Sequence, residues 1–467
     1  MPIKNDEQLY WLHLGAGAFH RAHQSWYLNQ LHQQGDRSWA LSLANIRNSS
    51  TQQTLQQLSR QQGRYTLEII SPDGEKQYQP IEAIGEVILW DNELKSLVAR
   101  GADPRTRIIS FTVTEGGYFL NEDGHLDLTH PAIAADLAQQ QETSTLYGAL
   151  VKILQQRMDD NSGAVTLLNC DNLRNNGDSV ARGLREFVAA QGNQALLAWI
   201  ERNTSAPNGM VDRITPKFDE AIFARLAQQG ITDDRAPLSC ESFSQWVLED
   251  NFIAGRPALE RAGVEFVSCV TPYEEAKIRV LNASHSGIAW AGALLGKQYI
   301  DQSLQPVISQ WMRDYVQQDV AAALGETQVD LALYCDTTLN RFSNQWVRDT
   351  TQRVSSDSIA KLQQFIVPTL KARYQQQSSP HAALILPALL FRFMQLRQRG
   401  ELPFEYQDRA LNEVPFDAIF ASDDPLQAFI QEKTLFGSLA AIPQFAQDMR
   451  RALERVDSGL QQTRGQS

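Results

Sequence analysis

Hydrophobic residues in the first half of the chain gather in short runs that alternate with amphipathic stretches. The apolar runs cover residues 9–14, 39–46, 86–90, 107–114 and 164–169. Stretches with helical spacing lie between or after them, at 25–34, 144–158 and 178–190. Short apolar strands that alternate with helices are typical of a mostly parallel sheet covered by helices on both faces. The first half is therefore predicted to be an α/β domain.

The second half has a different pattern. Beyond residue 276 the apolar positions follow a helical period, in segments at 277–295, 302–324, 357–374, 382–398 and 426–455. The stretch 203–217 is rich in Pro, Gly, Asn and Thr and is predicted to be a long loop. A chain of 467 residues exceeds the usual size of one domain. We therefore expect a dinucleotide-binding domain at 1–275, a helical substrate domain at 276–457 and a flexible tail at 458–467.

Composition and charge exclude several kinds of protein. The formal net charge of −12 argues against general binding to nucleic acid or to an anionic membrane surface. The four cysteines are widely spaced and form no metal-binding or disulfide pattern, which is typical of a reducing cytoplasm. The N-terminus has no apolar signal core, and the longest apolar stretch, 382–394, is too short to cross a bilayer. We expect a cytoplasmic protein.

A glycine pair follows the first apolar run, in the sequence Trp11-Leu-His-Leu-Gly15-Ala-Gly17-Ala-Phe-His-Arg. A strand, a tight Gly-x-Gly turn and a helix start form the Rossmann-type unit, in which backbone amides and the helix dipole favour a pyrophosphate. The match is incomplete, because His20 stands where the third glycine is expected. The residues expected to cradle a pyrophosphate are Gly15, Gly17, Phe19, His20 and Arg21.

A second group of polar residues lies past the middle of the chain. Lys277, Asn282 and His285 are spaced by five and three residues, so in an α-helix they span an arc of roughly 140° on one side. An amine that accepts a proton beside a fixed hydrogen-bond donor is suited to the oxidation of an alcohol. The pattern also occurs in helices with a solvated lysine and a buried structural histidine. It gains weight because a nucleotide-binding pattern opens the same chain.

Taken together, these motifs resemble the polyol-specific long-chain dehydrogenases, the mannitol dehydrogenase family. Further matching motifs follow in the family's order, up to about residue 440: Thr114-Glu-Gly-Gly-Tyr, Asn169-Cys-Asp-Asn172, Met210-Val-Asp-Arg-Ile-Thr-Pro, and Arg353 with Lys361. The resemblance implies metal-independent oxidation of a sugar alcohol to a ketose. D-arabinitol to D-xylulose is the preferred reaction and D-mannitol to D-fructose the next, and reduction of a hexuronate such as fructuronate stays open.

The resemblance also implies roles for individual residues. Lys277 is expected to be the general base, with its pKa lowered by burial or by the positive end of a helix dipole. Asn172 and Asn282 are expected to donate hydrogen bonds to the alkoxide. His285 is expected to orient the substrate, and Glu274 to pass the released proton to solvent, although a carboxylate three residues before a lysine is also an ordinary helix pair. The residues expected to bind the polyol are Asp212, Arg353 and Lys361.

The choice of nicotinamide cofactor is less clear from the sequence. Thr114 and Glu115 are expected to border the nicotinamide. Enzymes of this fold that use NAD usually place a carboxylate at the end of the second strand. Here that stretch reads Asn45-Ile-Arg47-Asn48, so Asn48 is expected to bind the ribose, whereas Arg47 is suited to a 2′-phosphate. NAD is favoured and NADP stays open. We expect no metal and a monomer or weak oligomer.

Overall fold

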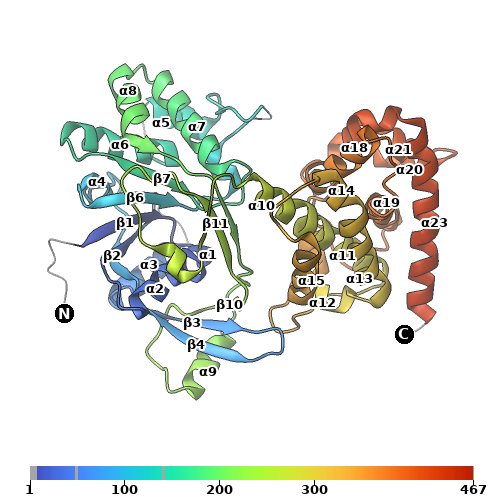
Figure 1. Cartoon of the computed structure of the whole chain (residues 1–467), viewed down its shortest axis with the longest axis horizontal. Helices are drawn as coiled ribbons and strands as arrows, with labels where there is room; N and C mark the ends of the chain where they lie inside the picture. Colours follow the sequence, from blue (N-terminus) through green and yellow to red (C-terminus); the bar gives the residue numbers. More distant parts are fainter. Residues whose placement is uncertain (1–7, 48–50, 122, 139–141, 466–467) are drawn as a thin grey trace. The chain divides into compact units, whose positions relative to one another are not determined.

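The chain forms two compact units, which a computed structural model describes at residues 8–47, 51–121, 123–138 and 142–465 (Figure 1). The N-terminal unit extends to Thr271, and the C-terminal unit begins at Pro272 and also includes Pro72–Gly74. The division falls close to the boundary predicted between residues 275 and 276. The N-terminal unit contains the strands, and the C-terminal unit is mainly helical (Figure 1).

A six-stranded sheet is the centre of the N-terminal unit, in the order β5-β2-β1-β6-β7-β8. All of its neighbouring strands are parallel. Its strands are β1 (Leu9–Leu14), β2 (Trp39–Ala44), β5 (Ile84–Ile88), β6 (Thr106–Phe111), β7 (Val165–Asn169) and β8 (Thr204–Ser205). Every residue of β2 and of β7 is buried, as expected for parallel strands covered on both faces. The predicted α/β fold is confirmed.

Helices cover both faces of this sheet. Two separate hydrophobic cores result, one that includes Trp11, Tyr27 and Trp246, and one that includes Leu12 and Phe111. The longer helices are α2 (Gln24–Gln33), α3 (Thr51–Arg60), α4 (Lys95–Ala102), α6 (Leu146–Asp159), α7 (Asn176–Ala190) and α8 (Gln194–Asn203). The strand order reverses at β1, since β2 lies on one side of it and β6 on the other. Sheets of this kind bind ligands at the carboxyl ends of the strands, at such a switch point.

The sequence analysis missed two small sheets. The hairpin β3 (Tyr65–Ile70) and β4 (Lys76–Ile81) pairs with β10 (Leu238–Glu241), and β9 (Gly209–Asp212) pairs with β11 (Gln245–Glu249) and β12 (Glu265–Val267). The prediction of one long loop over 203–217 was wrong, because β8 and β9 lie inside it. These strands are short, and their pairing with distant segments leaves little local pattern.

A buried arginine fastens the edge of the N-terminal unit opposite the carboxyl end of the strands. The Arg157 guanidinium donates to Gly101 O at 2.7 Å, to Thr106 O at 3.1 Å and to Gly163 O at 2.9 Å. It also donates to the carbonyls of Asp103, Ser162 and Ala164. One side chain thus satisfies carbonyls at the end of α4, the start of β6 and the loop before β7.

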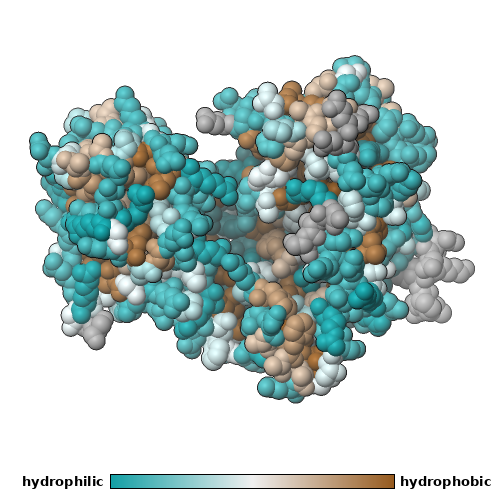
Figure 2. Space-filling view, turned by 180° about the vertical axis from the view of Figure 1, so that it is seen from behind, coloured by the Kyte–Doolittle hydropathy of each residue, from teal (hydrophilic) through white to brown (hydrophobic). Residues whose placement is uncertain are grey.

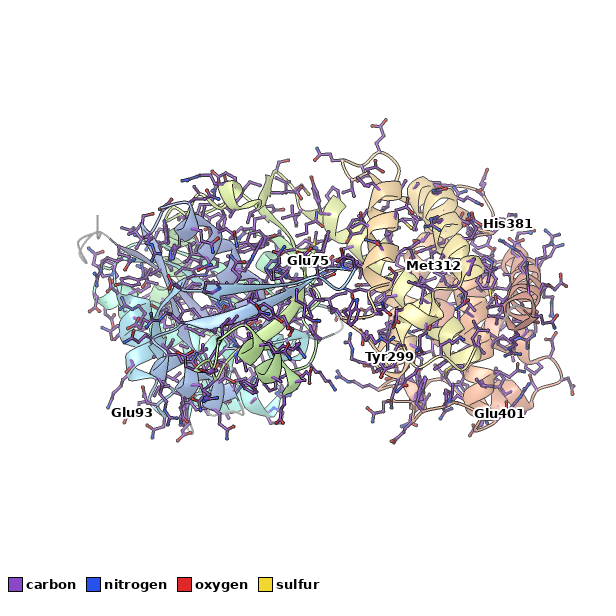
Figure 3. The ribbon with its side chains drawn as sticks, turned by 90° about the horizontal axis from the view of Figure 1, so that it is seen from below. Glu75, Glu93, Tyr299, Met312, His381 and Glu401 are labelled. Carbon is purple, nitrogen blue, oxygen red and sulfur yellow. The ribbon has the colours of Figure 1, made fainter. Side chains whose placement is uncertain are left out.

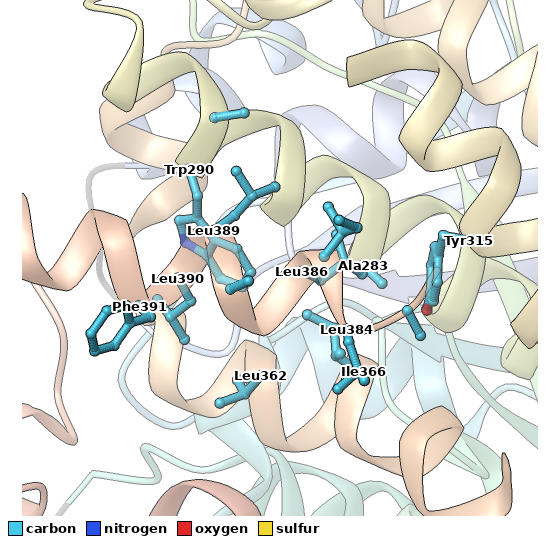
Figure 4. Packing of buried hydrophobic residues seen from close by; sticks show 14 of the residues in the cluster. Ala283, Trp290, Tyr315, Leu362, Ile366, Leu384, Leu386, Leu389, Leu390 and Phe391 are labelled. Carbon is cyan, nitrogen blue, oxygen red and sulfur yellow. The ribbon is translucent and has the colours of Figure 1, made fainter. Parts of the chain in front are cut away.

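The C-terminal unit is built around two buried helices, α11 (Ala283–Leu294) and α19 (Ile385–Gln398) (Figure 4). Gly287 allows their contact, since a Cβ there would lie 2.3 Å from Leu386 Cδ2. Met312, labelled in Figure 3, lies on one of the surrounding helices and is fully buried. These helices include α13 (Pro306–Asp314), α15 (Leu331–Phe342), α18 (Val367–Gln375) and α23 (Pro443–Gly465). The predicted helical second domain is confirmed.

Three helical segments of this unit have π-helical rather than α-helical hydrogen bonding. They cover Lys277–Asn282, Tyr315–Val320 and Leu362–Ile366. The first contacts each of the other two. It also joins α10 (Thr271–Ala276) to α11 without a break. π-helical turns are rare and are frequently found at functional sites, so the position of Lys277 and Asn282 at the two ends of one is informative.

The end of the chain differs from its prediction. A separate tail was predicted from residue 458, but α23 continues through Gly465 because Gly459, Leu460 and Thr463 are buried. In the described part of the chain no helix combines the length and the apolar character needed to cross a bilayer. Hydrophilic residues dominate the face shown in Figure 2, where apolar residues appear in small groups.

Candidate active site

The turn after β1 has a backbone that only glycine adopts readily. Gly15 has φ +116°, and a Cβ there would lie 2.4 Å from Thr112 O. The Gly15 N–H donates to Ala44 O at 2.8 Å, and the next amide, of Ala16, donates to Asn45 Oδ1 at 2.9 Å. Gly17 caps α1 (Ala18–Ala22), and a Cβ at Gly17 would meet nothing within 4 Å. The turn is fixed from behind and open on the side of Gly17, as a pyrophosphate requires.

His20 and Arg21 support this turn from inside the protein. The His20 ring is fully buried and stacks on His13 with 3.4 Å between ring centroids. Burial lowers the pKa of His13 to about 3 and holds that of His20 well below its ordinary value. Arg21 donates to Ala236 O at 2.7 Å, and the Tyr65 hydroxyl donates to Arg21 O at 2.6 Å. Both side chains are thus buried behind the turn, and contact of either residue with a pyrophosphate stays a prediction.

The remaining cofactor residues on this side are only partly defined. Phe19 is half-buried and stacks on His23 at 4.9 Å. Arg47, after the second strand, is exposed. Asn48, the predicted ribose ligand, lies outside the described residues.

The ends of β6 and β7 are held together by a carboxylate that the sequence analysis did not single out. Asp171 accepts the Val113 N–H at 2.7 Å and the Tyr118 hydroxyl at 2.5 Å. Burial raises the pKa of this carboxyl. Between its two partners the chain passes through Thr114, which has φ +63°, a strained value for a threonine. Thr114 and Glu115, after β6, are exposed, and so is Asn172, after β7. The two segments that Asp171 joins thus carry three of the predicted site residues.

Asp212 ends β9, Arg213 follows it, and both are buried. The Arg213 guanidinium donates to Ala22 O at 2.6 Å and to Glu241 O at 3.1 Å. It also lies over the Trp26 ring at 4.8 Å. Arg213 therefore joins the end of α1 to β10 and is not placed as a free cation.

Lys277 is not near the positive end of a helix dipole, and that part of the prediction was wrong. The helix begins at Thr271 and continues through Lys277 into α11, so its first turn ends before the lysine. Lys277 is buried and Asn282 half-buried. Hydrogen bonds from residue i to i+5 make five residues close to one turn, so Lys277 and Asn282 lie on nearly the same face. Glu274, one turn earlier, is buried too.

His285 lies on an aromatic surface one turn beyond Asn282. Its ring stacks on Phe342 with 4.1 Å between centroids and 17° between planes. Its Nε2 is buried and has no hydrogen-bond partner among the residues that the structure describes. Burial lowers the pKa of His285 to about 3, and the nearby Arg353 lowers it as well, against the opposing effect of Asp349. The lowered pKa keeps the imidazole neutral at neutral pH, and its role toward a substrate stays a prediction.

Two cations lie near His285, and each has a fixed partner. Arg353 donates to both carboxylate oxygens of Asp349, from Nε at 2.5 Å and from Nη2. Lys361 Nζ donates to Val354 O at 2.6 Å. Burial lowers the pKa of Lys361 to about 8. The structure thus brings His285, Arg353 and Lys361 together, and their predicted roles toward a polyol stay predictions.

Two supporting residues of this cluster were missed. Asp349 precedes Arg353 by four residues, a spacing at which helix pairs form, so the sequence carried a signal for it. Phe342 lies far from His285 in the sequence, and nothing local indicates their stacking. In the described part of the chain no three His, Cys, Asp or Glu side chains could hold a metal ion together. Metal independence itself stays a prediction.

Comparison with known proteins identifies the class. The sequence model of the mannitol dehydrogenase Rossmann domain matches residues 10–261, and that of the mannitol dehydrogenase C-terminal domain matches residues 269–457. The chain therefore belongs to the mannitol dehydrogenase family, the polyol dehydrogenases that its motifs resemble, and is an oxidoreductase.

Individual relatives are similar over nearly the whole chain. D-arabinitol 4-dehydrogenase of Klebsiella pneumoniae is 47% identical over 97% of this chain and 99% of that protein. The enzyme of that name from Ralstonia nicotianae is also 47% identical, over 96% of each chain. Among solved structures, a substrate-free D-sorbitol dehydrogenase has a TM-score of 0.88 at 30% identity, covering 98% of this chain and 96% of that one. Pseudomonas fluorescens mannitol 2-dehydrogenase in complex with NAD and D-mannitol has a TM-score of 0.81 at 31% identity, covering 99% and 95%.

Proposed function

We propose that this protein oxidises D-arabinitol to D-xylulose with NAD, and that Lys277 is the general base. The observation that carries the chemistry is the buried π-helical turn with Lys277 and Asn282 at its ends. Lys277 takes the hydroxyl proton of the substrate, and Asn282 donates to the oxygen as negative charge develops on it. Glu274, one turn before Lys277, then passes the proton to solvent. The role of Asn172 as a second donor stays a prediction.

The preference for a neutral polyol rather than a hexuronate rests on the charges around His285. Arg353 is paired with Asp349, and Asp349 and Asp357 both oppose the lowering of the Lys361 pKa. A substrate carboxylate needs an uncompensated cation, because a buried charge without a partner is costly. A neutral hydroxyl chain needs donors and acceptors, and His285, Arg353 and Lys361 supply them. The arabinitol assignment in turn rests on the two relatives at 47% identity.

The turn after β1 fits a dinucleotide, because a Cβ at Gly17 would occupy free space beside the start of α1. When bound, NAD supplies the hydride acceptor. Gly15, Gly17 and Phe19 would hold its pyrophosphate through the backbone, and Thr114 and Glu115 would border the nicotinamide. NAD is preferred over NADP because the relative with bound cofactor holds NAD, while the exposed Arg47 keeps NADP as the alternative.

The substrate and cofactor are tested by initial rates of oxidation of D-arabinitol, D-mannitol and D-sorbitol with NAD and with NADP. Reduction of fructuronate is measured alongside, and EDTA is present in every assay. Highest kcat/KM for D-arabinitol with NAD supports the proposal. Turnover of fructuronate but of no polyol contradicts it.

The base is tested by the Lys277→Ala variant. We expect kcat/KM to fall by about 10²–10⁴-fold and its pH profile to lose the basic limb. Lys297→Ala is the control, because Lys297 is a half-buried lysine that lies just beyond α11 and outside the π-helical turn. An unchanged pH profile in Lys277→Ala would show that another group accepts the proton.

A further inference from the structure

In the π-helical turn at Lys277–Asn282, the Arg279 carbonyl lacks the hydrogen-bond partner that an α-helix would give it. In an α-helix the Arg279 carbonyl accepts the N–H of Ala283, four residues later. Here the Ala283 N–H is directed to Ile278 O and Val280 O, on either side of Arg279. The Arg279 carbonyl instead accepts the hydroxyl of Tyr315 at 2.8 Å.

Tyr315 is well placed to hold this carbonyl permanently. It is fully buried and belongs to the same hydrophobic core as Ala283 (Figure 4). It begins the second π-helical segment, Tyr315–Val320, which contacts the first. Burial raises the pKa of Tyr315, so its hydroxyl keeps its proton at neutral pH and remains a donor.

We propose that Tyr315 is a positioning residue for the oxidation: its hydrogen bond to Arg279 O keeps the helix in the π form that aligns Lys277 with Asn282. The proposal rests on the proposed role of Lys277 as the base. Without the hydroxyl, the Arg279 carbonyl regains the Ala283 N–H as its partner and the turn tightens. Five residues of α-helix separate two side chains by roughly 140°, so Lys277 rotates away from Asn282. Tyr315 itself touches no reacting atom.

The Tyr315→Phe variant tests this proposal, since it removes one oxygen atom and keeps the ring in the core. We expect kcat to fall about 10²-fold, as for other small misplacements of catalytic groups. The KM for NAD is expected to stay unchanged, because the cofactor residues lie on other elements. Tyr374→Phe is the matched control. It removes a hydroxyl that donates to Asp448 Oδ2 at 3.0 Å in the same unit, rather than to a carbonyl of the π-helical turn, and is expected to keep kcat.

The double variant Lys277→Ala/Tyr315→Phe separates positioning from general weakening of the protein. If Tyr315 acts through Lys277, the second substitution causes no further fall in kcat once the lysine is absent. Independent losses that multiply overturn the proposal, and so does an unchanged kcat in Tyr315→Phe. A Tyr315→Phe protein that unfolds as a whole overturns it too, because a positioning residue leaves the fold intact.

Hydrogen exchange keeps this test distinct from that of the proposed function. Amides of residues 277–283 are expected to change their exchange rates in Tyr315→Phe and not in Tyr374→Phe. If Lys277→Ala keeps its basic limb, the base is misassigned, whereas the exchange data still decide whether Tyr315 holds the turn. Unchanged exchange at 277–283 overturns the positioning role whatever the identity of the base.

Discussion

The turns of the N-terminal unit and the helix that carries Lys277 present their site residues by opposite means. At Gly15 and Thr114 the backbone has positive φ, and it is kept there by groups behind the turn, such as the Asp171 carboxylate. At Lys277 the backbone is helical, and only its hydrogen-bond register differs. The strained turns are therefore stabilised by groups packed behind them. The hydrogen-bond register of the π-helical turn depends on the partner of one carbonyl, that of Arg279.

The largest expected effect is at Gly15. Gly15→Ala combines a positive φ with a Cβ 2.4 Å from a backbone oxygen, so we expect the free energy of unfolding to fall by about 3 kcal/mol or more. Gly17→Ala is the matched control, because its Cβ meets open space and is expected to cost about 1 kcal/mol or less. Gly17→Ala should instead raise the Kd for NAD. Urea unfolding and cofactor titration distinguish the two, and equal stability losses would contradict the geometry.

The next effect is at Asp171. Asp171→Ala removes the acceptor of the Val113 N–H and one acceptor of the Tyr118 hydroxyl. The free energy of unfolding is therefore expected to fall by about 1–3 kcal/mol. Release of the strained Thr114 turn should also raise the KM for NAD more than that for the polyol. Asp171→Asn keeps an acceptor oxygen, so its free energy of unfolding should fall by less than that of Asp171→Ala. Denaturant unfolding and initial rates check both, and an Asn variant as poor as Ala would argue that charge matters.

Lys361 gives a pH-dependent effect in the C-terminal unit. With a pKa of about 8, it loses its charge above that pH, and the KM for polyol should rise by about tenfold there. Because the pKa is lowered in the fold, the unfolded chain binds more protons between about 8 and 10.5, so the contribution of Lys361 to stability rises with pH in that window. Lys361→Arg stays charged and should keep its KM flat across pH 7–10. A wild-type KM that is flat over the same range would remove Lys361 from the binding group.

The smallest effect is expected at Phe342. Phe342→Leu removes the ring that stacks on His285, an interaction of about 1 kcal/mol, so the KM for polyol should rise about fivefold. The kcat and the pH profile should change little, because Lys277 keeps its place. Leu339→Ala, on the same helix α15, controls for loss of core packing. If both variants raise KM equally, the stacking has no specific role.

The sequence was sufficient for features that depend on local patterns. The apolar run at 9–14 and the glycines after it predicted β1 and its turn, and the spacing of Lys277, Asn282 and His285 predicted one helix. The hairpin β3–β4 and strand β9 were not predicted, because they pair with strands that lie far away in the sequence. The helix dipole assigned to Lys277 was wrong because the helical pattern was taken to begin at residue 277, whereas the helix already begins at Thr271.

The sequence indicates candidate polar residues for the site but not the groups that support them in the fold. Nothing in the sequence indicates that Ala283 skips the Arg279 carbonyl, because a π-turn arises from a bond made by Tyr315, far along the chain. Asp171 was visible within Asn169-Cys-Asp-Asn172, but its function depends on the Val113 amide, which only the folded sheet brings near. Residues that act through others are found by following hydrogen bonds, which a motif does not record.

Arg157 carries a consequence for how the protein responds to ionic strength. Its buried guanidinium is neutralised by carbonyl dipoles from three segments rather than by a carboxylate. Dissolved ions weaken attraction between exposed charges such as Lys95 and Glu93, but they do not reach this buried group. The attachment of this edge of the sheet is thus expected to be insensitive to changes in ionic strength.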